Sequence, residues 1–318
     1  MQLVYNAVQG VLTILFMVTV GYGLSKRGWF DERDSAFLSR LVLNLALPAL
    51  MFSNFTRAFD RKTLLQLGSG VVVPISVILG SYLVAALLAV VLRIPDRSRG
   101  TFRALFAFSN TIFVGLPVNL ALFGETAVPF VTLYYLVNTT LFWTLGVYYI
   151  RRDAEGKAKR TRFLSMETVR RILSPVLVSF LLAILLVLME VKLPPFLAAS
   201  FKYAAEMTTP LSMLIIGITM ASIGFKGIQW DRYTIAILVG RFLVAPSIAW
   251  LVLSQFLVPE LMGKVFLVSA SLPVMTQVAI ASKAFGADDR RASALVTLTT
   301  ALSLGVIPFY MFLLTLQK

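Results

Sequence analysis

The sequence predicts an all-α integral membrane protein of ten transmembrane helices. Of its 318 residues, 58% are hydrophobic and only 14% are charged, which is more apolar surface than one soluble core buries. The apolar segments recur in lengths of roughly 20 residues, which lets a helix rising about 1.5 Å per residue cross about 30 Å of hydrocarbon. The period-2 alternation of a β-barrel is absent, so these segments are predicted to be helices.

Apolar windows bounded by charged residues, glycine and proline define the helices in order. The first window lacks a cationic leader and runs a full span to Lys26, so we expect a helix there and no cleaved signal. The expected helices, numbered 1 to 10, cover residues 3–24, 36–56, 65–92, 102–123, 126–150, 168–189, 200–223, 232–257, 262–284 and 290–315.

The distribution of basic residues predicts the topology. The polar stretch 151–171 is expected to be a linker between residues 1–150 and 172–318, with five helices on each side. Loops after the odd-numbered helices hold twenty Lys and Arg residues, whereas the opposite side holds seven. By the positive-inside bias, we expect a multi-pass membrane protein with a cytoplasmic linker and both termini outside.

Short matches indicate that the two halves are repeats. VPIS in helix 3 matches APSI in helix 8 at an offset of 172 residues. The tripeptide LPV occurs in helices 4 and 9 at an offset of 156 residues, and VTL occurs in helices 5 and 10 at an offset of 165 residues. Each match is weak, and their common order is the evidence. Because each half has an odd number of helices, the second half enters the membrane in the opposite sense, as in the inverted repeats of secondary transporters.

Two prolines in this pattern predict broken helices and a binding site. Pro117 in helix 4 and Pro273 in helix 9 remove backbone donors near the expected midplane, which is tolerated where a break lines a cavity or is buried in protein. Half-helices that start at such breaks direct their positive N-terminal ends at an anion, and neighbouring amides and hydroxyls complete its hydrogen bonds. The candidate binding residues are Asn110, Thr111, Gly115, Pro117, Asn119, Pro273, Thr276 and Gln277. There are two structural alternatives: the polar side chains only join neighbouring helices by hydrogen bonds, or each proline forms a simple kink that a neighbouring helix fills.

Arg241 completes the candidate set as a basic residue well inside a span. It is interpreted either as a functional residue or as a partner of carbonyls at a helix break. Lys283, at the end of helix 9, is expected to extend toward the membrane surface. The chain has no cysteine and no histidine, and no carboxylate in mid-span, so we expect no enzyme, no cofactor, no metal site and no carboxylate-based ion relay.

Four stretches resemble the auxin efflux carrier family, and the resemblance covers nearly the whole chain. They are LNLALPALMF at Leu43–Phe52, NTIFVGLP at Asn110–Pro117, RFLVAP at Arg241–Pro246, and Leu272–Pro273 followed by ASKAFG at Ala281–Gly286. The resemblance implies a scaffold of helices 1, 2, 6 and 7 that forms a homodimer, and a transport domain of helices 3–5 and 8–10. It also implies that helices 4 and 9 cross, that Asn110 binds a carboxylate, and that transport is of the elevator type. A bacterial member of the family would lie in the inner membrane.

Together these observations predict a secondary transporter of a small organic anion, which binds neither nucleic acid nor a cofactor. A sodium-coupled symporter of the bile-acid type and a membrane ligand sensor that transports nothing remain alternatives. Malonate, malate and an aromatic acid all fit a site made of helix dipoles and amides. The sequence leaves the substrate, the coupling ion, the direction of net transport and the oligomeric state open.

Overall fold

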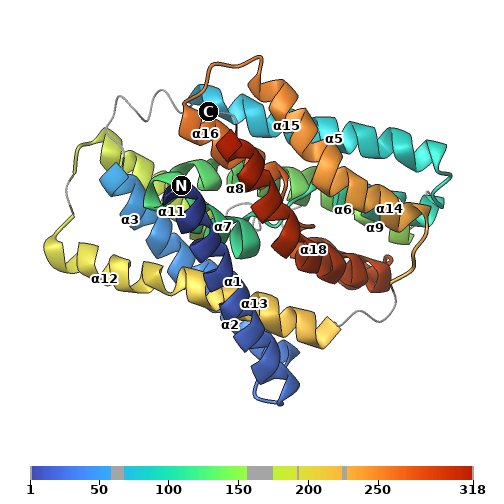
Figure 1. The fold of residues 1–318 in the computed structure, drawn as a ribbon, viewed down its shortest axis with the longest axis horizontal. Helices are drawn as coiled ribbons and strands as arrows, with labels where there is room; N and C mark the ends of the chain where they lie inside the picture. The colour runs from blue at the N-terminus through green and yellow to red at the C-terminus, as the bar shows by residue number, and fades with distance from the viewer. Residues whose placement is uncertain (1, 59–67, 156–174, 192, 224–227, 317–318) are drawn as a thin grey trace.

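The computed structural model describes residues 2–58, 68–155, 175–191, 193–223 and 228–316. This part of the chain is helical throughout, apart from loops and one isolated β-bridge (Figure 1). In chain order the α-helices are α1 (Gln2–Lys26), α2 (Glu32–Leu41), α3 (Leu47–Ala58), α5 (Val72–Val91), α6 (Arg99–Ala107), α7 (Leu116–Phe123), α8 (Val128–Leu141), α9 (Val147–Glu155), α11 (Pro175–Leu188), α12 (Pro195–Glu206), α13 (Thr208–Ile223), α14 (Arg232–Val239), α15 (Ala245–Leu253), α16 (Glu260–Ala270), α17 (Thr276–Phe285) and α18 (Asp289–Leu316). Short 3₁₀ segments are η2 (Gly68–Val71), η3 (Asp96–Ser98) and η5 (Glu125–Ala127).

Every stretch expected to span the membrane contains helix in its described part. Among the described residues, five helical runs are long and apolar enough to cross a membrane, and three shorter apolar helices accompany them. Most of the linker expected at 151–171, and the expected start of helix 6, lie outside the described residues. The helix expected over 36–56 begins earlier, at Glu32, because Asp31 and Asp34 form a reciprocal capping box there.

Four π turns interrupt the spans: η1 (Val42–Ala46), η4 (Thr111–Gly115), η6 (Phe142–Gly146) and η7 (Gly240–Val244). Three of them end two residues before a proline, at Pro48, Pro117 and Pro246. A proline inside an α-helix lacks its N–H and clashes with the carbonyl four residues back. A π turn just before the proline widens the helix locally, so we attribute the continuation of the helix through these prolines to it. The prediction that Pro117 breaks helix 4 is therefore wrong.

Two groups of helices pack around the site. In one group α1 packs along α13, and α3 packs on α11 and α12; in the other, α5 packs on α6 and α15, α9 on α6, and α17 on α18 (Figure 1). Small residues bring α1 and α13 together, because a Cβ on Gly217 would lie 2.2 Å from the Val18 carbonyl oxygen. A Cβ on Gly21 would similarly lie 2.7 Å from the Leu214 carbonyl oxygen. The site lies where the two groups meet.

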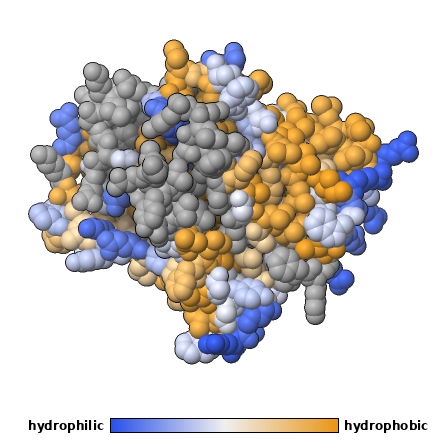
Figure 2. Space-filling view, in the orientation of Figure 1, coloured by the Kyte–Doolittle hydropathy of each residue, from blue (hydrophilic) through white to orange (hydrophobic). Residues whose placement is uncertain are grey.

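The surface is apolar over much of its area, as a bilayer requires. Leu79, Leu83 and Leu87, spaced four residues apart on one face of α5, are exposed. Figure 2 shows apolar residues spread over α14 and α15, whereas hydrophilic residues gather at the right-hand edge and at the lower tip, where α1 turns into α2. This pattern is that of a multi-pass membrane protein.

Candidate functional site

The centre of the site is a pair of chain breaks that bind each other. Helix α6 ends at Ala107 and α16 ends at Ala270, and a short non-helical segment follows each of them before η4 starts at Thr111 and α17 starts at Thr276. The Asn110 N–H donates to the Pro273 carbonyl at 2.9 Å, and the Met275 N–H donates to the Phe108 carbonyl at 3.0 Å. These reciprocal bonds form an antiparallel bridge between Ser109 and Val274. The two broken helices therefore meet at their breaks.

Proline chemistry and two neighbouring helices account for the breaks. Pro273 has no N–H and disfavours helical backbone at Leu272, so α16 ends before it. The Asn138 side chain, from α8, receives the Ser109 N–H at 3.3 Å and donates to the Ser109 carbonyl at 2.9 Å. The Thr299 hydroxyl oxygen, from α18, accepts the Val274 N–H at 3.2 Å. The midpoint of each break thus has a side-chain partner in place of water.

Asn110 joins the N-termini of the two helical segments that follow the breaks. Its Oδ1 accepts the Phe113 N–H at 3.3 Å and caps η4, which continues into α7. Its Nδ2 donates at 3.0 Å to the hydroxyl of Thr276, the first residue of α17. Helix N-termini carry a partial positive charge and unpaired N–H groups. Two such ends therefore converge at Asn110.

A cavity of about 790 Å³ extends from this junction between the two groups of helices. Asn110, Met275, Thr276 and Gln277 line its inner part. Apolar and aromatic side chains make up much of the wall: Phe113, Tyr135, Trp143, Ile215, Ile280 and Val296. The lining continues to Lys283 near the end of α17 and to the beginnings of α2 and α18. A largely apolar cavity with a few convergent polar groups is typical of a small-molecule site.

Arg241 lies at the carbonyl ends of the two helices that stop at the crossing, whereas Asn110 lies at the N–H ends of the segments that follow. Its guanidinium is 1% exposed and donates to the C-terminal carbonyls of both first half-helices. The Phe106 and Ala107 carbonyls receive Nη1 at 3.2 and 3.1 Å, the Ala270 carbonyl receives Nη2 at 2.9 Å, and the Leu272 carbonyl receives Nη2 and Nε at 2.7 and 3.1 Å. All five N–H donors of the guanidinium are thereby used.

A glycine beside Arg241 permits this close approach. A Cβ on Gly240 would lie 2.2 Å from the Phe106 ring. The arrangement matches the second interpretation of Arg241, a partner of carbonyls at a helix break. Arg241 does not line the cavity.

The structure brings three of the nine predicted site residues to the cavity: Asn110, Thr276 and Gln277. The Asn119 amide is fully buried in α7 and donates to the Gly115 carbonyl at 2.7 Å. The remaining residues shape the backbone or pack around the crossing: Thr111, Gly115, Pro117, Pro273 and Arg241. Asn110 lies inside the break of helix 4, because this break is at Phe108–Asn110 and not at Pro117, as expected from the sequence.

Sequence reasoning missed several residues of the site. Asn138 and Thr299 support the breaks, and the aromatic wall comes from Phe113, Tyr135 and Trp143. An asparagine in mid-span was the available signal for Asn138. Aromatic residues in a membrane helix give no such signal, because most of them contact lipid or pack inside the protein.

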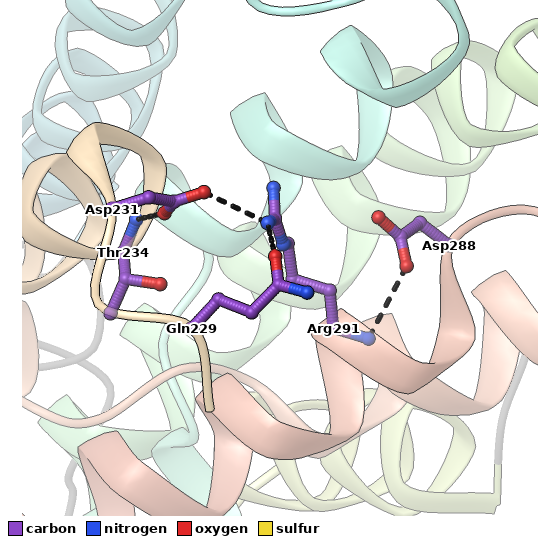
Figure 3. A network of polar contacts seen from close by, with 5 residues as sticks. All are labelled: Gln229, Asp231, Thr234, Asp288 and Arg291. Carbon is purple, nitrogen blue, oxygen red and sulfur yellow. Dashed lines mark hydrogen bonds and ion pairs between the residues drawn. The ribbon is translucent and has the colours of Figure 1, made fainter. Parts of the chain in front are cut away.

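A polar cluster outside the cavity fastens the ends of α14 and α18 (Figure 3). Asp231 caps α14 by accepting the Thr234 N–H at 3.0 Å, and its other oxygen accepts Arg291 Nη2 at 2.8 Å. Arg291 also donates to the Gln229 side chain and stacks over the Tyr233 ring at 4.6 Å. Asp288 accepts the Arg291 N–H at 3.3 Å. The cluster ties the helix that leads to Arg241 to the helix that holds Thr299.

Sequence comparison shows that this chain is similar to proteins that are named transporters. An uncharacterized transporter of Methanocaldococcus jannaschii is 26% identical over 309 residues, covering 96% of this chain and 97% of that protein. The uncharacterized transporter YfdV of Escherichia coli is 26% identical over 219 residues, 68% of this chain and 69% of its own. A Rhizobium meliloti protein named "Putative malonate transporter" is 24% identical over 314 residues, 96% of this chain and 94% of its own.

A family model described as membrane transport protein matches residues 6–311, which is nearly the whole chain. The chain therefore belongs to this family of membrane transporters, the auxin efflux carrier family.

Proposed function

We propose that the chain is a secondary transporter of a small organic anion and that it binds a carboxylate of its substrate at Asn110, Thr276 and Gln277. The observation that carries the proposal is the convergence of two helix N-termini on one cavity. Their partial positive charges attract an anion without a buried permanent charge. The name of the Rhizobium meliloti relative, with malonate as the acid, is compatible with a carboxylate substrate.

We propose alternating access by an elevator movement, and the position of the cavity supports this proposal. The cavity lies between a group containing α2 and α13 and a group containing α8, α17 and α18. Sliding the second group, with both broken helices, along the first would carry a substrate across the membrane. We therefore propose α1–α3 and α11–α13 as the scaffold and α5–α9 and α14–α18 as the transport domain, arranged as a ten-helix inverted repeat.

The uneven distribution of Lys and Arg residues between the two sides of the membrane supports a proposal for the orientation of the protein. The cavity reaches the beginnings of α2 and α18 and the ends of α13 and α17, whose connecting loops lie on the side that holds most of the basic residues. By the positive-inside rule this is the cytoplasmic side. We propose that both termini face outward, that the structure is open to the cytoplasm, and that the scaffold helices form a homodimer.

The test is carboxylate counterflow into proteoliposomes containing purified protein. Proteoliposomes with wild-type protein are preloaded with an unlabelled carboxylic acid, in a series that includes malonate, succinate and butyrate. We expect them to accumulate the labelled form of at least one of these acids from outside. Asn110→Asp is the decisive variant. Its carboxylate keeps the acceptor for the Phe113 N–H but places a negative charge at the site, so we expect transport to fall at least tenfold while the folded protein is retained.

Thr276→Ser and Thr276→Val form a matched pair. Serine keeps the hydroxyl that Asn110 binds, whereas valine keeps the shape and removes it. We expect serine to transport like wild type and valine to be impaired. Counterflow by Asn110→Asp at the wild-type rate would contradict the site, and a series without any transported acid would contradict the proposed function. Repeating the assay without sodium tests the sodium-coupled alternative.

A further inference from the structure

One face of α17 lines the cavity from the crossing to its outer part. Thr276, Ile280 and Lys283 are spaced four and three residues apart, so they lie in one row along the helix, and all three line the cavity. Read outward from the crossing, the row is a hydroxyl, an apolar side chain and an ammonium group. The two polar ends of the row are separated by an apolar middle.

Lys283 is available to a ligand. Its side chain is exposed, and no hydrogen bond or ion pair joins it to another described residue. The other charged residue among the described lining is Asp289. Asp289 lies in the first turn of α18, where the partial positive charge of the helix N-terminus stabilises a carboxylate. Lys283 is therefore the cation of this cavity.

The spacing of the row sets the length of a matching ligand. Seven residues separate Thr276 from Lys283, which is about 10 Å along a helix that rises about 1.5 Å per residue. Side chains on a helix lean toward its N-terminus, so the Lys283 stem leans toward Thr276. With a reach of about 6 Å for the four-carbon stem, the ammonium can reach levels between about 4 and 10 Å from Thr276 along the helix axis.

We propose that Lys283 binds a second anionic group of the substrate, so that the transported acid is a dicarboxylate. The first carboxylate lies at Asn110 and Thr276, a short hydrocarbon segment passes Ile280, and the second carboxylate meets the Lys283 ammonium. This inference rests on the proposed function, because it assumes that the first carboxylate binds at the crossing. It assigns to Lys283 the choice between mono- and dicarboxylates.

Matched acids of equal carbon number test the proposal. Affinities of purified protein in detergent are measured by thermal shift for malonate and propionate, succinate and butyrate, glutarate and valerate, and adipate and hexanoate. We expect wild-type protein to bind at least one dicarboxylate ten or more times more tightly than its monocarboxylate partner. Lys283→Gln should remove most of this preference, because it weakens binding of the dicarboxylate more than binding of the monocarboxylate. Lys283→Arg should restore most of the preference.

Lys264→Gln is the matched control, because Lys264 is a lysine of the same half of the chain that pairs with Glu260 and does not line the cavity. It should keep the wild-type preference. Equal affinity of both members of every pair in wild type, or an unchanged preference in Lys283→Gln, would overturn the inference. If Asn110→Asp weakens both acids while Lys283→Gln changes neither, the proposed function stands and only the second subsite is refuted. If no acid of either kind binds, both fail.

Discussion

Replacement of Arg241 by methionine tests how the crossing is held together. Methionine fills much of the same space but offers no hydrogen bond, so the substitution removes five donors without leaving a large cavity. The carbonyls of Phe106, Ala107, Ala270 and Leu272 lose these partners. Water cannot replace the guanidinium, because all four residues are buried. The C-terminal ends of two half-helices would also face each other without a cation.

The expected loss of stability follows from the four carbonyls. A buried polar group that loses its partner costs about 1–3 kcal/mol. Four carbonyls at the lower limit give a destabilisation of about 4 kcal/mol. At about 2 °C per kcal/mol for a large chain, the melting temperature should fall by about 8 °C or more. Arg241→Lys keeps the charge but has only three donors, so its melting temperature should lie between those of wild type and Arg241→Met.

The assay is thermal unfolding of purified protein in detergent, followed by the loss of the monodisperse peak in size-exclusion chromatography. Arg232→Ala is the control, because Arg232 is exposed at the start of the same helix, α14. It should melt like wild type. An Arg241→Met protein that melts within about 2 °C of wild type would refute the reasoning from the carbonyls. If that protein were also inactive, Arg241 would act on the substrate rather than on the crossing.

Two further predictions concern the ends of helices. Arg291→Ala removes the bonds to Asp231 and Gln229 (Figure 3) and should lower the stability of the protein by about 1–2 kcal/mol. The same unfolding assay measures this loss, with Arg290→Ala as the control because Arg290 is exposed. Equal melting temperatures of the two variants would contradict the prediction. The backbone N–H groups of Asp34 and Arg33 hold the pKa of Asp31 below 3.8, so its capping of α2 is complete above that value and is lost as the pH falls through the lowered pKa. Hydrogen exchange in the first turn of α2 should accelerate there, and a rate that follows only the intrinsic pH dependence would contradict this.

Apolar length and punctuation predicted the helical stretches well, because a bilayer imposes one length and one chemistry on every span. The break in helix 9 was also predictable, since Pro273 lies within it. The break in helix 4 was placed at Pro117 and lies at Phe108–Asn110. No proline marks it; it depends on Asn138 and on pairing with the other break. Such long-range bonds leave no local signal in the chain.

The two breaks bear on the sequence matches from which we propose an inverted repeat. The bridge pairs Ser109 with Val274, an offset of 165 residues. That is the offset of the VTL match between helices 5 and 10, whereas the LPV match has an offset of 156 residues. Pro117 lies inside a continuous helical segment, whereas Pro273 lies between two helices. The LPV match therefore does not mark corresponding places in helices 4 and 9.

The single charge at the crossing explains how a site without a basic residue at its inner end can favour an anion. A broken helix leaves a negative carbonyl end and a positive N–H end, and two crossed breaks place both kinds close together. Left alone, these partial charges would largely cancel. Arg241 binds the carbonyl ends, and the cavity lies at the N–H ends, beside Asn110 and Thr276. Because the negative ends are paired with a cation and the positive ends are not, we expect a positive potential at the inner end of the cavity. Under the proposed function, Arg241 therefore favours an anionic substrate from outside the cavity, by neutralising the carbonyl ends of the two broken helices.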